Sequence, residues 1–202
     1  MKITALKTQV KNAERVSIFV DGKYTFSLTI NEVIEYKLKK DLEVTEADIE
    51  TYKKLSADGK LRARAYEWLM GRPHSTKELR DYLYKKKTDK DLQAKLISEF
   101  TDKGILSDQR FAEWSVERLE RKNKSQRAII SELRAKGIDT TVIQSVVGRG
   151  DSKDAQQLVT LLAKLQSRPR YTDQQKLIAY LISKGYRYDD IKQALGLTQI
   201  QQ

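Results

Sequence analysis

The residues that could do chemistry in this chain are few, because the sequence has a single histidine and no cysteine. A catalytic or metal-binding histidine needs an orienting partner or further ligands, and His74 has no second histidine or cysteine to join it. Ser75 could act as a nucleophile, but no Gly-x-Ser-x-Gly turn surrounds it. Ser75 instead precedes Glu78 by three residues, which is the spacing of a capping box at the start of a helix. We therefore expect both residues to be structural.

Acidic residues that could hold a metal ion occur as close pairs in three places. These pairs are Asp89 with Asp91, Glu117 with Glu120, and Asp189 with Asp190. A two-metal nuclease needs carboxylates that converge in one cleft, whereas these pairs start predicted helices, where the helix dipole favours them, or lie on charged faces. The glycines of Gly148–Gly150 form too short a segment to cradle a phosphate. The sequence thus predicts no catalytic residue, no metal site and no cofactor, and a metal-dependent nuclease is the weakest alternative.

The strongest chemical signal is positive charge in the middle of the chain. The protein has 39 Lys and Arg residues against 28 Asp and Glu residues, a net charge of +11. Residues 1–59 contain 10 basic and 10 acidic residues, residues 60–137 contain 20 and 12, and residues 138–202 contain 9 and 6. A local excess of this kind is typical of proteins that bind a phosphate backbone or a nucleic-acid complex. A solvated, lysine-rich helical face is the structural alternative.

The basic residues gather around two predicted helices, one beginning after Ser75 and one after Ser125. We predict that partner or DNA contacts come from Arg72, Lys77, Arg80, Lys85, Lys86, Arg118, Arg121, Lys122, Lys124 and Arg127. Arginine offers a forked set of donors to phosphate or carboxylate, whereas lysine acts as a point charge. Tyr84 is the best candidate for stacking on a base, while Trp68 and Trp114 fit core packing.

An N-terminal β-hairpin and helix extension is predicted for residues 1–59. Two segments of alternating apolar and polar residues, 15–20 and 23–28, flank Asp21-Gly22, the strongest short signal for a hairpin turn. Residues 3–10 are a candidate strand before this hairpin.

Helices are predicted to complete the extension. Asn31 is the candidate cap of a short first helix. Thr45, followed three residues later by an aspartate, resembles a capping box that opens a second helix over residues 46–55. Asp58-Gly59 is predicted to end this region, so that a new helix begins at Lys60.

The rest of the chain repeats one pattern three times: a polar cap, an amphipathic helix and a shorter apolar segment. The caps are Ser75, Ser125 and Asp173. In the last two copies the spacing is the same, with Leu133, Gly137, Ile143, Val147 and Gly148 matching Leu181, Gly185, Ile191, Leu195 and Gly196. We predict a mainly α fold in which the extension precedes a tandem array of three three-helix repeats, over residues 60–106, 107–149 and 150–198. Such arrays usually serve binding through their surfaces.

Three segments together resemble one known family. The segment Arg72–Leu79 reads Arg-Pro-His-Ser-Thr-Lys-Glu-Leu, Gly104–Ala112 reads Gly-Ile-Leu-Ser-Asp-Gln-Arg-Phe-Ala, and the third runs from Ile129 to Ile138. Their combination resembles the signatures of the RecX regulatory proteins, and the resemblance covers roughly residues 60–196.

The chain departs from the family pattern at several loop positions. Lys87 stands where the pattern has glycine, so we expect this helix to end without a left-handed residue. Ser107 replaces an acidic residue, and Lys122–Lys124 lies where a glycine is common. Arg110, inside one of the matching segments, is expected to pair with Asp108 or another acid.

The resemblance implies a function. RecX proteins bind the RecA recombinase, especially its filament on single-stranded DNA, and suppress ATP hydrolysis, strand exchange and co-protease activity. The resemblance therefore implies a non-enzymatic, monomeric regulator with RecA and single-stranded DNA as partners, and with duplex DNA as a further candidate.

The residues themselves leave a second function open. A stand-alone basic DNA-binding module or a helix-turn-helix-like transcription regulator is the alternative, because three-helix units can resemble that motif. The lack of cysteine fits a reducing cytoplasm, and no apolar run is long enough to span a membrane. We expect a cytoplasmic protein in either case.

Overall fold

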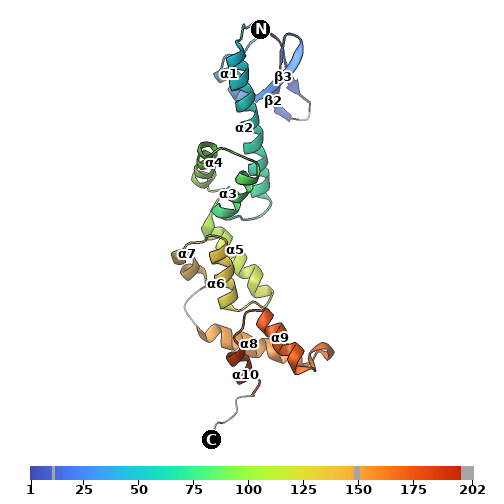
Figure 1. The fold of residues 1–202 in the computed structure, drawn as a ribbon, viewed down its shortest axis with the longest axis vertical. Coiled ribbons are helices and arrows are strands. Elements are labelled where there is room, and N and C mark those ends of the chain that lie inside the picture. The colour runs from blue at the N-terminus through green and yellow to red at the C-terminus, as the bar shows by residue number, and fades with distance from the viewer. Residues whose placement is uncertain (11, 148–150, 197–202) are drawn as a thin grey trace. The chain divides into compact units, whose positions relative to one another are not determined.

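The computed structural model describes residues 1–10, 12–147 and 151–196, with the side chains of 151–153 left aside. The fold is mainly helical with a small sheet near the N-terminus, as predicted (Figure 1). Internal contacts divide the chain into two units, Met1–Gly71 with Lys90–Leu92, and Arg72–Asp89 with the chain from Gln93 onward. The turn predicted at Gly148–Gly150 lies outside the described residues. Within the described part, no helix is both long and apolar enough to cross a bilayer.

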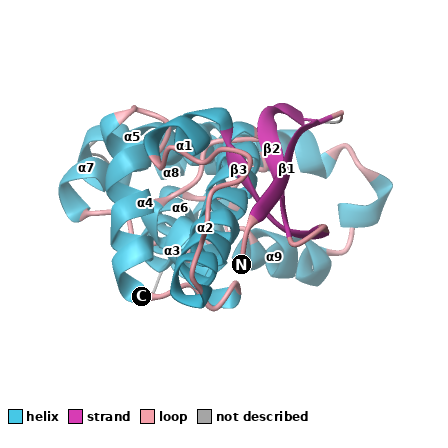
Figure 2. Ribbon diagram, turned by 90° about the horizontal axis from the view of Figure 1, so that it is seen from above, coloured by secondary structure: helices cyan, strands magenta, loops and turns pink. Residues whose placement is uncertain are grey.

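The N-terminal unit contains an antiparallel sheet, drawn in magenta in Figure 2. Strands β1 (Ile3–Gln9), β2 (Asn12–Val20) and β3 (Lys23–Thr29) pair in the order β1-β2-β3. Between β2 and β3, the φ angles of Asp21 and Gly22 are 47° and 81°. Both are positive, as a type I′ turn requires. The predicted hairpin and the candidate first strand are therefore confirmed.

Two capped helices follow the sheet. Helix α1 (Ile30–Glu35) is capped by Thr29. The prediction that Asn31 is the cap is therefore wrong. The reason is the capping box: Glu32 reaches back to the Thr29 amide at 2.7 Å, while Asn31 has no such partner three residues on. Helix α2 (Glu46–Met70) begins with the predicted capping box of Thr45 and Asp48.

The predicted break at Asp58-Gly59 is wrong, because α2 runs through it without interruption. A glycine inside a helix costs only about 1 kcal/mol relative to alanine. The helix also packs closely here: a Cβ at Gly59 would lie 3.4 Å from Arg15 Nη1 and 3.6 Å from Glu32 Oε1, at ordinary contact distance. This cost is small enough for α2 to continue through the glycine with Arg15 and Glu32 packed beside it.

The apolar core of this unit lies between the sheet and its helices. It is built from alternate strand residues together with one stripe of α2 and the loop before it. Its buried members are Ile3, Ile18, Val20, Phe26, Leu28, Leu38, Val44 and Ile49.

Helices form the rest of the described chain. They are α3 (Thr76–Lys85), α4 (Lys90–Asp102), α5 (Asp108–Arg121), α6 (Gln126–Ala135), α7 (Thr140–Val147), α8 (Asp151–Gln166), the 3₁₀ turn η1 (Pro169–Tyr171), α9 (Gln174–Ser183) and α10 (Tyr188–Ala194). The predicted caps Ser75, Ser125 and Asp173 all accept hydrogen bonds from the first turns of α3, α6 and α9. The start of each copy of the repeated pattern is therefore correct.

The backbone conformation at the end of α3 differs from the prediction. Lys87, expected to avoid the left-handed region, has a φ of 58°, and Gly137 and Gly185 have φ angles of 75° and 96° at the matching positions. The geometry of this helix end is therefore set by the repeat, and a lysine adopts it at a steric cost of about 1–2 kcal/mol.

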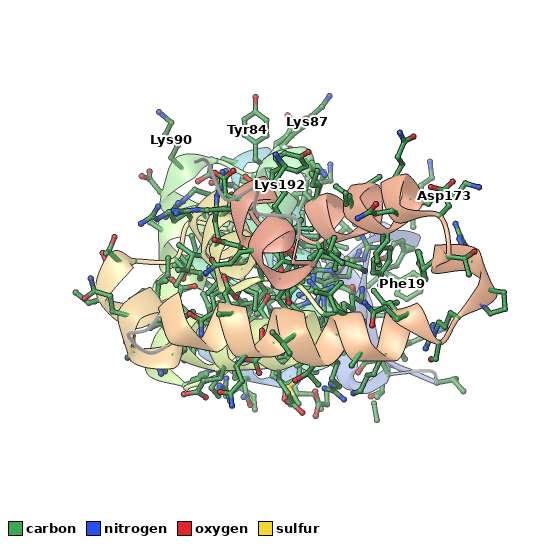
Figure 3. The ribbon with its side chains drawn as sticks, turned by 90° about the horizontal axis from the view of Figure 1, so that it is seen from below. Phe19, Tyr84, Lys87, Lys90, Asp173 and Lys192 are labelled. Carbon is green, nitrogen blue, oxygen red and sulfur yellow. The ribbon has the colours of Figure 1, made fainter. Side chains whose placement is uncertain are left out.

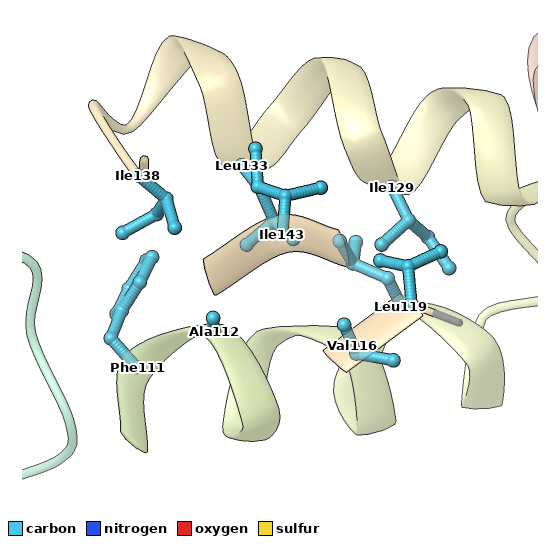
Figure 4. Packing of buried hydrophobic residues seen from close by; sticks show 9 residues of the cluster. Phe111, Ala112, Val116, Leu119, Ile129, Leu133, Ile138 and Ile143 are labelled. Carbon is cyan, nitrogen blue, oxygen red and sulfur yellow. The ribbon is translucent and has the colours of Figure 1, made fainter. Parts of the chain in front are cut away.

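The last two copies each enclose an apolar core. Helices α5, α6 and α7 bury Phe111, Ala112, Val116, Leu119, Ile129, Leu133, Ile138, Ile143 and Val147 (Figure 4). Helices α8, α9 and α10 bury Leu158, Leu161, Leu162, Leu165, Leu177, Leu181, Tyr186 and Ile191. The division into segments 60–106, 107–149 and 150–198 stays a prediction, since α2 crosses residue 60 as one helix.

Candidate partner-binding surface

The start of α3 meets the end of α6 through a set of polar contacts. The Ser75 hydroxyl accepts the amide of Glu78 at 3.1 Å and donates to the carbonyl of Lys136 at 3.0 Å. The Thr76 amide donates to Asp108 Oδ1 at 2.7 Å, and Lys77 Nζ donates to the carbonyl of Ala135 at 2.8 Å. The Thr76 amide at the start of α3 is thus satisfied by Asp108 of α5, and two carbonyls at the end of α6 are satisfied by the side chains of Ser75 and Lys77.

The start of α6 meets the end of α9 in the same way. The Ser125 amide donates to the carbonyl of Lys184 at 3.0 Å, and the Gln126 amide donates to Asp154 Oδ1 at 2.7 Å. Lys124 Nζ donates to the carbonyl of Ser183 at 2.8 Å. The two sets of contacts, which we call the first and second junctions, bring the positive end of one helix dipole to the negative end of the next.

Glycine allows the close approach at the second junction. A Cβ on Gly185 would lie 2.5 Å from the Cβ of Ala128 and 2.7 Å from the hydroxyl of Ser125. The backbone of Gly185 is also left-handed, with a φ of 96°. Only glycine combines this conformation with the available space.

Two predicted contact residues therefore have structural partners. Lys77 and Lys124 each hold a carbonyl at the end of the neighbouring repeat's helix, one at each junction. The sequence shows that both residues are charged but does not show that they bind these carbonyls, because the accepting groups lie 58 and 59 residues away along the chain.

Glu78 organises the charged part of the first junction. Only half of the predicted capping box forms, because the Glu78 carboxylate turns away from the Ser75 amide. The carboxylate accepts hydrogen bonds from Arg72 Nη1 and His74 Nδ1 at 2.9 Å each, and from Lys136 Nζ at 2.8 Å. The Glu78 side chain is 12% exposed. Burial alone would raise the pKa of this carboxyl, but the hydrogen bonds from Arg72 and Lys136 outweigh it and lower the pKa to about 2.

Two further predicted residues flank Trp114. The guanidinium carbons of Arg72 and Arg118 lie 5.1 and 5.0 Å from the centre of its indole ring. Arg118 also forms an ion pair with Glu132 at 2.8 Å. Trp114 itself packs against the core residue Phe111, as expected for a tryptophan in core packing. Arg72 and Arg118 thus make contacts within the protein that stabilise the fold.

Two more arginines are paired locally. Arg121 forms an exposed ion pair with Glu117 at 3.1 Å, one helical turn away. The predicted pairing of Arg110 with Asp108 does not form, because Asp108 accepts a hydrogen bond from the Thr76 amide at the first junction. Arg110 instead donates to the carbonyls of Gly104 and Ile105 and closes the loop before α5.

The remaining predicted residues are exposed. Arg80, Lys85, Lys122 and Arg127 have no ion-pair partner within the described part of the chain, and Lys86 lies 5.6 Å from the Tyr82 ring. Tyr84, the predicted stacking residue, is 76% exposed and projects from α3, as does Lys87 beyond the helix end (Figure 3). These residues are available to a partner.

A groove beside the second junction adds arginines that the sequence analysis missed. It has a volume of about 940 Å³ and is lined by residues of α6, α8 and α10. Arg127 and Arg134 lie on its α6 side, and Arg187 precedes α10. All three are exposed and lack an ion-pair partner among the described residues. Arg134 could have been found, because it is seven residues after Arg127 and thus on the same helix face.

The rest of the groove is mixed in character. Ile130 and Leu158 supply apolar surface, and Val159 is 58% exposed at its side. Asp154 and Asp190 also line it, but the Asp154 carboxylate is occupied by the Gln126 amide. We call this region the arginine groove, defined by Arg127, Arg134 and Arg187. Its chemistry suits an anionic partner with some apolar surface.

Comparisons with known proteins agree with this architecture. Residues 1–45 match the model of the regulatory protein RecX N-terminal domain. Residues 107–147 and 154–195 match those of the second and third RecX three-helix domains.

Curated relatives match over nearly the whole chain. The regulatory protein RecX of Listeria innocua serovar 6a is 32% identical over 200 residues, covering 96% of this chain and 74% of the relative. The regulatory protein RecX of Bacillus subtilis strain 168 is 33% identical over 199 residues, covering 96% and 75%.

Solved structures share the fold. A crystal structure of regulatory protein RecX aligns with a TM-score of 0.69 at 21% identity, covering 96% of this chain and 98% of the other. The structure of RecX from Lactobacillus salivarius aligns with a TM-score of 0.54 at 24% identity, covering 69% and 95%. Together with the curated relatives, these matches show that the chain belongs to the RecX family of regulatory proteins.

Proposed function

We propose that this protein is a non-enzymatic regulator that binds RecA and its filament on single-stranded DNA. Family membership supports the partner, since the relatives are regulatory RecX proteins. The single structural observation that carries the proposal is the set of exposed basic residues without ion-pair partners among the described residues, namely those of the arginine groove and Arg80, Lys85 and Lys122. A nucleoprotein filament presents both phosphates and protein carboxylates to such a surface.

Binding would inhibit RecA by restraining it. A helical array can contact more than one subunit of a filament, because its repeats present successive surfaces along the chain. Such contacts would oppose the subunit movements that accompany ATP hydrolysis, strand exchange and co-protease activity. The regulator needs no catalytic group for this, and we propose that it acts as a cytoplasmic monomer.

The proposal is tested by titrating RecA with this protein on single-stranded DNA at two salt concentrations and measuring ATP hydrolysis. We expect inhibition at well below one regulator per RecA subunit, weakening steeply as salt rises, because neutralised phosphates release counterions. Undiminished ATP hydrolysis at saturating regulator would contradict the proposal.

A stand-alone DNA-binding module remains the second candidate. The observation that favours it is the cluster of exposed Arg80, Tyr84 and Lys85 on α3, which could contact DNA without RecA. Footprinting on duplex DNA separates the candidates: a protected sequence, together with unchanged RecA activity, would favour the independent module.

A further inference from the structure

One face of the N-terminal sheet is left open by the helices of its unit. Alternate residues of β2 from Val16 to Val20 are buried on the side of α1 and α2. Ser17 and Phe19 lie between them and therefore face the other way, because successive side chains of a strand alternate. In Figure 1, α1 and α2 stand together on one side of β2 and β3.

The strand register extends this outward face across the sheet. Phe19 pairs with Tyr24 on β3, and Ser17 pairs with Lys7 on β1. Gln9 also belongs to it, since its side-chain amide donates to the Ser17 hydroxyl at 3.0 Å. We call this surface the open sheet face and define it by Lys7, Ser17, Phe19 and Tyr24.

Two aromatic rings and a cation meet on the open sheet face. The ring centres of Phe19 and Tyr24 are 6.0 Å apart at an interplanar angle of 76°, an edge-to-face contact. Lys7 Nζ lies 5.3 Å from the centre of the Phe19 ring. Tyr24 is 51% exposed, so its ring presents free surface to solvent.

The charge on this face is positive. Lys7 supplies an exposed cation to this face, whereas Arg15 is buried, with its guanidinium against the hydroxyl and carbonyl of Ser27 and close to Gly59 of α2. None of the described strand positions on this side carries a carboxylate. The acidic residues of the unit lie mainly in α1, α2 and the loop between them, away from Lys7.

We infer that the open sheet face binds unpaired bases of single-stranded nucleic acid, with one base stacked on Tyr24 and the adjacent phosphate near Lys7. An exposed ring beside a cation supplies the two groups that sequence-independent binding of single strands uses. A duplex is a poor ligand for this face, because its base faces are already stacked. The inference adds a DNA contact to the proposed function but does not require RecA.

The test measures DNA binding by the full chain without RecA. The probe is a fluorescently labelled oligothymidylate about 20 nucleotides long, followed by anisotropy. We expect Tyr24→Ala to weaken binding about fivefold to tenfold, the size expected from losing one stacked base, while Tyr24→Phe stays within about twofold of wild type because phenylalanine keeps the ring. The matched control is Tyr66→Ala, since Tyr66 is 44% exposed in the same unit but lies on α2.

Several outcomes would overturn the inference: no binding of the oligonucleotide by wild type, equal losses for Tyr24→Ala and Tyr66→Ala, or an equal loss for Tyr24→Ala on duplex of the same length. Circular dichroism melting of each variant checks that the fold is retained. RecA inhibition is measured in parallel. A wild-type protein that binds the oligonucleotide through Tyr24 but leaves RecA active would contradict the proposed function and support the inference.

Discussion

Glu78 is the residue on which the charged contacts of the first junction converge. Its carboxylate receives Arg72, His74 and Lys136 while being only 12% exposed. Arg72 in turn lies against the Trp114 ring, which packs on the core of α5 to α7. One side chain thus links the start of α3, the end of α6 and the aromatic edge of the neighbouring core.

We predict that Glu78→Gln destabilises the protein by about 3 kcal/mol, because it leaves partly buried cations without their counter-charge. Chemical denaturation followed by circular dichroism measures the change in free energy of unfolding. The control is Glu117→Gln, which removes one partner of an exposed ion pair with Arg121 and should cost no more than about 0.5 kcal/mol. Equal effects of the two substitutions would mean that Glu78 does not organise the junction.

The same carboxyl predicts a dependence of stability on pH. The pKa of Glu78 is about 2 in the folded protein against an ordinary value of 4.5, so the unfolded chain binds this proton more readily. The stabilisation is therefore fully present above pH 4.5 and is lost as the pH falls from 4.5 towards 2. The stability difference between wild type and the E78Q variant should shrink over that interval. A difference that stays constant down to pH 2 would contradict this assignment.

At the scale of the elements, the two junctions repeat one arrangement. In each, a capping serine and a lysine at the start of one helix contact the last carbonyls of the next repeat's helix, and an aspartate accepts the first helical amide. The glycine after the contacted helix is what lets the segments approach. The junction is therefore a property of paired elements and not of either helix alone.

We predict that Gly185→Ala destabilises the protein more than Gly104→Ala does. Both positions have positive φ angles, 96° and 64°, so both variants bear a backbone cost of about 1–2 kcal/mol. Only at position 185 would the new methyl also collide with Ala128, at 2.5 Å, adding about 1–3 kcal/mol of overpacking. A Cβ at Gly104 meets nothing within 4 Å. Thermal melting that ranks the variants equally would argue against a tight second junction.

At the scale of the whole molecule, much of the positive charge is already used within the fold. Arg72, Lys77, Arg118 and Lys124 bind protein groups, and reversing their charge would disturb packing as well as partner binding. The arginine groove is different, because its three guanidinium groups are exposed and unpaired among the described residues. It therefore offers the better test of a partner surface.

We predict that the double variant Arg127→Glu with Arg134→Glu inhibits RecA ATP hydrolysis at least about fivefold less well than wild type, with an unchanged melting temperature. The loss should shrink at high salt, because exposed charges are then screened. The control is Lys39→Glu with Lys40→Glu, which makes the same change in net charge at exposed loop positions of the N-terminal unit. If the control weakens inhibition equally, net charge and not the groove determines binding.

The sequence alone determined the local features of this protein. The hairpin at Asp21-Gly22, the caps at Thr45, Ser75, Ser125 and Asp173, and the helical pattern of buried leucines all follow from contacts within a few residues. For the same reason the family signatures could be recognised, since they consist of these short segments.

The tertiary structure decided which charges remain free. Glu78 binds Lys136, 58 residues away, instead of completing its capping box. Asp108 accepts a hydrogen bond from the Thr76 amide instead of pairing with Arg110. The arginine groove likewise joins Arg134 to Arg187 across separate helices. A charged side chain binds whichever partner the fold brings within about 3 Å and shields from water, and linear spacing does not specify that partner beyond the next helical turn.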